Sequence, residues 1–146
     1  MSLDFLNIQP LLKGYGIQPR KSLGQNFLIE PAGLMKVINA AELTGGEEVL
    51  EIGAGLGSLT YLLAQSCAHV TTVEIDSHML DPLTEALKPF DNVNIVPGDI
   101  LQLDPSNLLT QENYVVVANI PYYITSAIIR HLLEAEASAY TEIAVV

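Results

Sequence analysis

The sequence predicts a doubly wound α/β fold, in which a mainly parallel sheet carries helices on both faces. Three observations predict it. Short runs rich in β-branched residues alternate with longer helical patterns along the whole chain. The strand candidates are continuous apolar runs, which is typical of strands buried on both faces. Turn residues such as Gly45-Gly46 separate the runs. Short, right-handed connections then favour an order with the first strand near the middle of the sheet.

Each element has its own signal. Pro31 opens a helix over 31–43, whose apolar residues recur on one face. The expected strands, in chain order, are 48–53, 69–75, 92–100, 113–120 and 141–146. Further helices are expected over 57–67, 77–90 and 125–137. Ser77 is the expected N-cap of the helix over 77–90, with Pro82 in its first turns.

Length and composition restrict the class of protein. The 146 residues are enough for one domain with a real core, and 49% of them are apolar. No run is long enough to span a membrane, and the first ten residues lack the layout of a signal peptide, so a soluble, cytoplasmic protein is expected. The single cysteine, Cys67, excludes an internal disulfide and a cysteine-based metal cluster, and no histidine shows ligand spacing, so no metal is expected.

The charge balance is unusual for a protein that binds RNA. Seventeen acidic and six basic residues give a net charge of −11. Three of the bases, Lys13, Arg20 and Lys21, lie near the amino terminus. The pattern fits a basic arm on an acidic body, and it equally fits an acidic surface that keeps the protein in solution.

A glycine loop follows the first strand in "LEIGAGLGSLT". Gly53, Gly55 and Gly57 permit positive φ angles and a close approach of the backbone to a ligand. The dinucleotide-binding pattern G-x-G-x-x-G would need its third glycine at Ser58. The spacing found, after the acid Glu51, favours S-adenosylmethionine over NAD, and a tight turn without a ligand is the alternative.

Acidic residues end the next two strands. Glu74 lies 21 residues after Gly53, where a carboxylate can accept hydrogen bonds from both hydroxyls of a ribose. Asp99, in "PGDI", can accept a hydrogen bond from the exocyclic amine of adenine, although Gly-Asp is also common in turns. Asp76 is expected to be a solvated acid or the cap of the next helix.

The stretch "VANIPYYITS" breaks the fourth strand. Pro121 keeps Ile120 extended and removes an amide donor, which directs the Ile120 carbonyl toward the crevice beside the amide oxygen of Asn119. These two acceptors can hold the N6 amine of an adenine whose flat face lies on Tyr122. The alternative is an Asn-Pro turn capped by core tyrosines, and Tyr123 is assigned to that core role.

The motifs "KSLGQNFL", "EIGAGLGSLT", "VEID", "GDIL" and "NIPYYI" together resemble the ribosomal RNA adenine N6 dimethyltransferase family over about residues 8 to 146. The resemblance is strongest to the branch that dimethylates two adjacent adenosines in a hairpin near the 3′ end of small-subunit rRNA. It implies a Rossmann-like class I methyltransferase fold, S-adenosylmethionine as cofactor and small-subunit rRNA as partner, in ribosome biogenesis. It also implies roles for the matching positions: Asn26 and Leu28 at the methionine end of the cofactor, Gly53 beneath it, Glu74 on the ribose, Asp99 on the adenine, and Asn119, Ile120, Pro121 and Tyr122 at the reaction centre.

The resemblance also implies a domain division. Residues 1–30 form an amino-terminal arm with a loop that contacts the cofactor, and 31–146 form a Rossmann-like domain truncated after its fifth strand. Family members continue into a basic, helical RNA-binding domain, which this sequence lacks. We therefore expect cofactor binding, poor or no methylation, and self-association through an exposed sheet edge ending in "IAVV".

Three other functions share some of these motifs. Macrolide-resistance methyltransferases modify a large-subunit adenosine and contain similar "QNFL" and "NIPY" segments. A non-catalytic RNA-binding or transcription-factor relative would keep the fold, but the intact Asn119, Pro121 and Tyr122 argue against it. An NAD-dependent oxidoreductase is disfavoured by the glycine spacing.

Overall fold

The protein contains a five-stranded parallel sheet, here described from a computed structural model over residues 31–111, 113–118, 122–134 and 140–145. The strands are β1 (Glu48–Ile52), β2 (His69–Glu74), β3 (Val93–Pro97), β4 (Asn113–Ala118) and β5 (Tyr140–Val145). Their order is β3-β2-β1-β4-β5, and every neighbouring pair is parallel. The predicted fold class and the central position of the first strand are confirmed.

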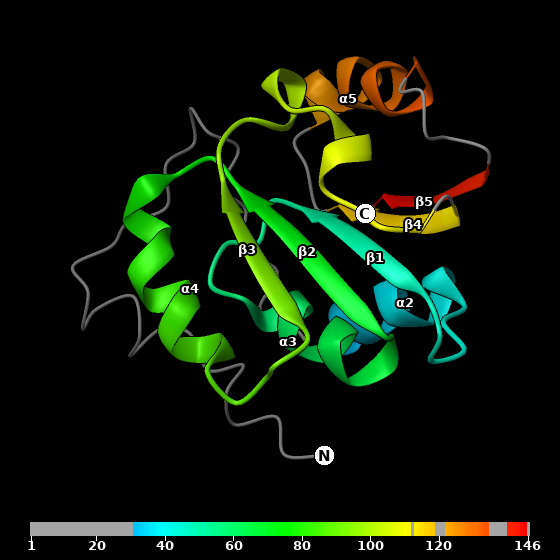
Figure 1. Cartoon of the computed structure of the whole chain (residues 1–146). Coiled ribbons are helices and arrows are strands. Elements are labelled where there is room, and N and C mark those ends of the chain that lie inside the picture. The colour runs from blue at the N-terminus through cyan, green and yellow to red at the C-terminus, as the bar shows by residue number, and fades with distance from the viewer. Residues whose placement is uncertain (1–30, 112, 119–121, 135–139, 146) are drawn as a thin grey trace.

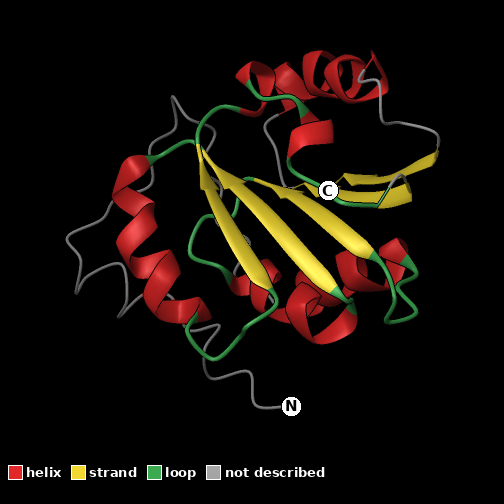
Figure 2. Ribbon diagram, in the orientation of Figure 1, coloured by secondary structure: helices red, strands yellow, loops and turns green. Residues whose placement is uncertain are grey.

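Helices cover both faces of the sheet (Figures 1 and 2). On one face lie α2 (Pro31–Ala41), α3 (Ser58–Ser66) and α4 (Leu80–Leu87), and on the other lies α5 (Tyr122–Glu134). Successive side chains of a strand point to opposite faces. Val49 of β1 therefore packs with α2 and α3, whereas the next residue, Leu50, packs with Ile128 and Leu132 of α5.

The winding of the chain reverses between β1 and β4. From β1 the chain proceeds outward through β2 to β3, and it then crosses back to β4 through the short 3-10 helices η4 (Ile100–Gln102) and η5 (Pro105–Asn107). Ile52 pairs with Ala118, so β1 and β4 end side by side. In sheets of this kind, ligands bind outside the carboxyl ends of the strands at this reversal.

Several predicted boundaries were wrong. The helix expected over 77–90 is a 3-10 turn, η3 (Ser77–Met79), followed by α4, and Asp76 rather than Ser77 is the cap, since its side chain accepts a hydrogen bond from His78 N. The third strand ends at Pro97 because Gly98, with φ 142°, turns the chain away. The last helix begins at Tyr122 instead of 125.

Two further features concern the outside of the molecule. In the part of the chain that the structure describes, no helix is both long enough and apolar enough to cross a membrane. Strand β5 lies at one edge of the sheet, where it pairs with β4, and β3 lies at the other edge.

Candidate functional site

The glycine loop joins β1 to α3 with three residues in left-handed conformations. Gly53, Gly55 and Gly57 have φ values of 84°, 57° and 87°, which side chains with a Cβ rarely adopt. At Gly57 space is also limiting, because a Cβ there would lie 2.9 Å from Cδ1 of Leu83 in α4. The loop therefore depends on glycine at the point where it turns into α3.

Glu74 joins the end of β2 to this loop. Its Oε1 accepts a hydrogen bond from Gly55 N at 2.7 Å, and its Oε2 accepts one from Asp76 N at 2.8 Å. The side chain is buried, and burial raises the pKa of Glu74, although the two amide hydrogen bonds oppose that shift. The structure thus brings together two of the predicted cofactor residues, Gly55 and Glu74.

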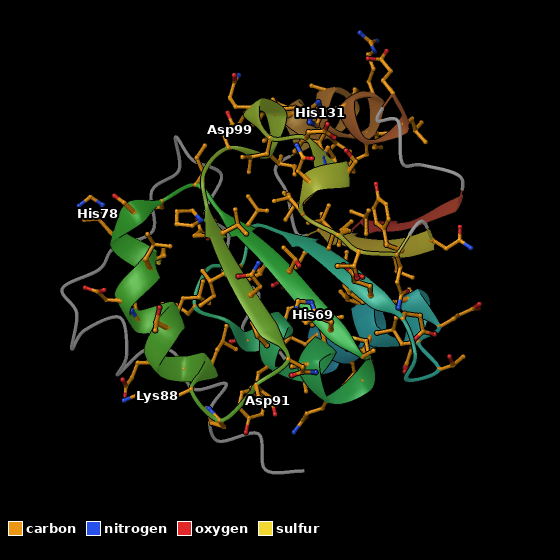
Figure 3. The ribbon with its side chains drawn as sticks, viewed as in Figure 1. His69, His78, Lys88, Asp91, Asp99 and His131 are labelled. Atoms are coloured by element: carbon orange, nitrogen blue, oxygen red, sulfur yellow. The ribbon has the colours of Figure 1, made fainter. Side chains whose placement is uncertain are left out.

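Asp99 lies at the same end of the sheet (Figure 3). It follows β3 and caps η4, since its Oδ1 accepts a hydrogen bond from Leu101 N at 3.0 Å. The preceding residue, Gly98, donates its N–H to the Glu74 carbonyl at 2.9 Å. The turn that carries Asp99 is therefore fastened directly to the residue predicted to hold the ribose, and Asp99 also has the turn role that the sequence left open.

Asp76 is buried rather than solvated. It is 3% exposed, and its Oδ1 lies 3.0 Å from both the backbone nitrogen and the Nδ1 of His78. Of its two predicted roles, the helix cap is confirmed and the solvated acid is wrong. Asp76 also contributes to the site, because its charge raises the pKa of Glu74.

Sequence reasoning missed Ile75, and it named Glu51 only as the acid before the glycine loop, without its burial or its hydroxyl partners. Ile75, directly after Glu74, is 51% exposed, so an apolar side chain lies on the surface at the end of β2. Glu51 is 1% exposed and accepts hydrogen bonds from the hydroxyls of Thr60 and Thr72. The sequence pattern that could have revealed Ile75 is an apolar residue directly after a carboxylate at the end of a strand. The pattern that could have revealed the burial of Glu51 is an acidic residue inside an apolar strand.

The predicted reaction centre is only partly described. Asn119, Ile120 and Pro121 lie outside the described residues, as do Asn26 and Leu28. Tyr122 begins α5, and the side chain of Tyr123 is 58% exposed. The core role assigned to Tyr123 was therefore wrong, because α5 turns this residue outward from the sheet.

Metal-binding groups do not gather at this site. Within the ranges that the structure describes, no three His, Cys, Asp or Glu side chains are grouped so that they could hold a metal ion.

His131 donates from Nε2 to the Leu103 carbonyl at 2.6 Å, which fastens α5 to the segment after η4. The chemistry available at the described site is therefore that of carboxylates, backbone amides and one apolar surface.

A parallel sheet of this order, with a glycine loop after the central strand and a buried carboxylate ending the next, is the fold of the class I S-adenosylmethionine-dependent methyltransferases. The profile of the ribosomal RNA adenine dimethylase family matches residues 16–146. The chain belongs to that family.

Individual relatives agree with this assignment. Ribosomal RNA small subunit methyltransferase A of Dehalococcoides mccartyi (strain CBDB1) is 43% identical over 127 residues, which cover 86% of this chain and 44% of the relative. The crystal structure of 23S rRNA methyltransferase ErmE has a TM-score of 0.68 at 37% identity, covering 77% of this chain and 44% of that one.

A dimethyladenosine transferase from Plasmodium falciparum has a TM-score of 0.63 at 32% identity, covering 73% of this chain and 38% of that one. The chain spans less than half the length of the curated relatives it matches.

Proposed function

We propose that this chain is the cofactor-binding part of an enzyme that dimethylates N6 of two adjacent adenosines in a 3′-terminal hairpin of small-subunit rRNA. The observation that carries the proposal is the Glu74 carboxylate, held at the end of β2 by Gly55 N and Asp76 N. Each of its oxygens keeps a further lone pair for a hydroxyl of a ribose. The described residues therefore fit a nucleoside cofactor.

We assign the remaining roles from the resemblance to the family and, for Ile75 and Asp99, from their positions next to Glu74 and to the turn bonded to it. Asp99 accepts the adenine amine, Ile75 offers an apolar surface to the ring, and Gly53 and Gly55 let the backbone approach the ligand. Asn26 and Leu28, in the arm over 1–30, hold the methionine end. Residues 31–146 form the cofactor-binding domain, and RNA binding depends on a further, basic region of the complete protein.

The bound cofactor supplies an electrophilic methyl group. The residues that follow Ala118 hold the target amine: the Asn119 side-chain oxygen and the Ile120 carbonyl accept hydrogen bonds from its N–H groups, and Tyr122 stacks on the base. Because Ala118 pairs with Ile52, the chain leaves β4 beside the start of the glycine loop. Positioning of the amine, rather than a strong base, then supplies much of the rate enhancement.

Calorimetric titration of the chain tests the cofactor assignment. S-adenosylmethionine and S-adenosylhomocysteine are both expected to bind, and NAD is not. Glu74→Gln is expected to weaken both interactions at least tenfold, since it loses a charged acceptor worth about 1.5–3 kcal/mol. Glu85→Gln, on the exposed side of α4, is the matched control. Binding of NAD alone, or of none of the three ligands, contradicts the proposal.

One observation favours a second substrate class. The similarity to ErmE, a 23S rRNA methyltransferase, is consistent with a large-subunit adenosine as target. Methyl transfer by the complete protein to small-subunit and large-subunit rRNA, assayed side by side, distinguishes the two. The chain over 1–146 alone is expected to transfer little or no methyl group to either RNA, because it spans 44% of the length of its relative.

A further inference from the structure

Glu51 is a buried carboxyl that the proposed reaction does not use. It lies on β1, two residues before Gly53, and is 1% exposed. Its Oε1 accepts hydrogen bonds from Thr60 in the first turn of α3 and, at 2.7 Å, from Thr72 on β2. Its Oε2 is buried and has no hydrogen-bond partner among the described residues. The group therefore joins both flanks of the glycine loop and retains one unpaired oxygen.

The surroundings disfavour a negative charge on this group. Burial raises the pKa of Glu51 to about 7, the hydrogen bonds from Thr60 and Thr72 lower it, and the charge of Glu74 raises it further. Among the described residues, Glu74 is the charged group that acts on it. The other titratable side chains on or next to β1, β2, β4, α2 and α3 in the described ranges are Lys36, Glu42, Glu47, Glu48, Tyr61, Cys67, His69, Asp76 and Tyr114.

We propose that Glu51 is a positioning residue that distinguishes the positively charged S-adenosylmethionine from its neutral product, S-adenosylhomocysteine, by releasing a proton when the cation binds. The inference rests on the proposed function. A sulfonium bound over the glycine loop favours the carboxylate over the carboxylic acid, so the O–H bond breaks and the proton goes to solvent. After the product forms, the positive charge is gone and the carboxyl takes a proton back.

The two ligands form a matched pair. They share the adenine, the ribose and the amino-acid end, so any effect of Glu74 on the ribose is common to both. They differ by one methyl group and one positive charge. The ratio of their dissociation constants therefore isolates the response to charge from the rest of the binding energy.

Titration calorimetry at pH 6 and pH 8, in two buffers of different ionisation enthalpy, measures both affinity and proton release. S-adenosylmethionine is expected to release protons near pH 7, and S-adenosylhomocysteine is not. Preference for the cation is expected to rise about fivefold between the two pH values, which is what a fall of about one unit in the pKa of Glu51, from about 7, produces over that range. This measurement on the unsubstituted chain needs no variant.

Three substitutions assign the effect to Glu51. Glu51→Gln keeps the shape of the side chain but cannot ionise, and it is expected to abolish the pH dependence of the preference. Thr72→Val removes a hydrogen bond that favours the carboxylate, so the transition is expected at higher pH. Glu48→Gln is the control, because Glu48 is equally buried on β1 but lies at its other end, bound to Thr110 and Gln111.

The outcomes separate the two proposals. If neither ligand binds, the proposed function fails. If both bind and their affinity ratio does not change with pH, the function stands and the role of Glu51 is overturned. Circular dichroism of Glu51→Gln checks that it folds, and a folded variant that keeps the full pH dependence also overturns the role. If the pH of the transition in ligand preference rises in Thr72→Val and does not change in Glu48→Gln, the role of Glu51 is supported.

Discussion

Glycine is needed at Gly57 and at Gly45 for different physical reasons. Gly57 has a positive φ and a crowded surrounding, since an added Cβ would meet Leu83 at 2.9 Å. Gly45 has a φ of 110° but nothing within 4 Å of an added Cβ. The two positions therefore separate the cost of backbone strain from the cost of crowding.

Gly57→Ala is expected to lower the free energy of unfolding by about 2–5 kcal/mol, the sum of about 1–2 kcal/mol for the left-handed backbone and about 1–3 kcal/mol for overpacking against Leu83. Gly45→Ala has the backbone cost alone and is expected to lose about 1–2 kcal/mol. Urea unfolding at pH 7 measures both. Equal losses would show that contact with α4 does not constrain the loop.

Glu51 also makes stability depend on pH. Its pKa is about 7 in the folded chain against 4.5 for the ordinary group, so the folded state holds a proton that the unfolded state loses between these values. Its contribution is fully present below pH 4.5 and is lost as pH rises through 7, on the order of 3 kcal/mol in all. Between pH 5 and pH 8 the unsubstituted chain is expected to lose stability.

Glu51→Gln should lose much less stability over the same range, which chemical denaturation at the two pH values measures. Repulsion between the other acidic residues of this chain, whose net charge is −11, also changes stability with pH. That effect remains in Glu51→Gln, so the variant is an internal control for it. A pH profile that is the same with and without the substitution would exclude an ionising Glu51.

At the scale of elements, sequence reasoning located every strand and α-helix of the described chain, but not the 3-10 helices η4 and η5 and not all of the ends. Apolar runs determined where the strands lie, because burial on both faces leaves little choice of residue. The ends depend on hydrogen bonds between distant segments, as between Gly98 N and the Glu74 carbonyl. No sequence pattern near either residue predicts such a hydrogen bond.

For the site, sequence reasoning likewise predicted the positions of residues along the chain but not their contacts with distant segments. Spacing alone placed Glu74 at the end of β2 and the glycines in the loop after β1. The hydroxyl partners of Glu51 come from residues 9 and 21 positions away, and they depend on how α3 and β2 pack against β1. Tyr123 was misjudged because it was assigned to the core as part of a turn, whereas α5 already begins at Tyr122 and leaves Tyr123 exposed.

One side chain closes the carboxyl end of α3. Asn92, just before β3, donates from Nδ2 to the carbonyls of Ala64 at 2.9 Å and Ala68 at 3.4 Å. Asn92→Ala is expected to cost about 1–2 kcal/mol, because it leaves a helix carbonyl without this donor. Asn94→Ala, at an exposed position on β3, is the control and should change stability by at most about 0.5 kcal/mol. Thermal unfolding compares the two, and equal effects would contradict the capping role.

At the scale of the whole molecule, ligand binding and folding are linked. A ligand that binds only the folded state, at about 100 times its dissociation constant, adds about 2.7 kcal/mol of stability. For a chain of 146 residues this corresponds to a rise of about 5–10 °C in melting temperature. S-adenosylhomocysteine is expected to cause such a rise in thermal denaturation, and Glu74→Gln should greatly reduce it. A comparable rise with NAD would indicate a different class of cofactor.

The order of the strands affects how the chain folds while it is being synthesised. Val49 pairs with Val70 on one side and with Val115 on the other, so its second neighbour follows 115 − 49 = 66 residues later. At about 5–20 residues per second, the ribosome delivers that neighbour roughly 3–13 s after Val49. During that interval the centre of the eventual sheet is an open edge, which makes the nascent chain a natural client for chaperones.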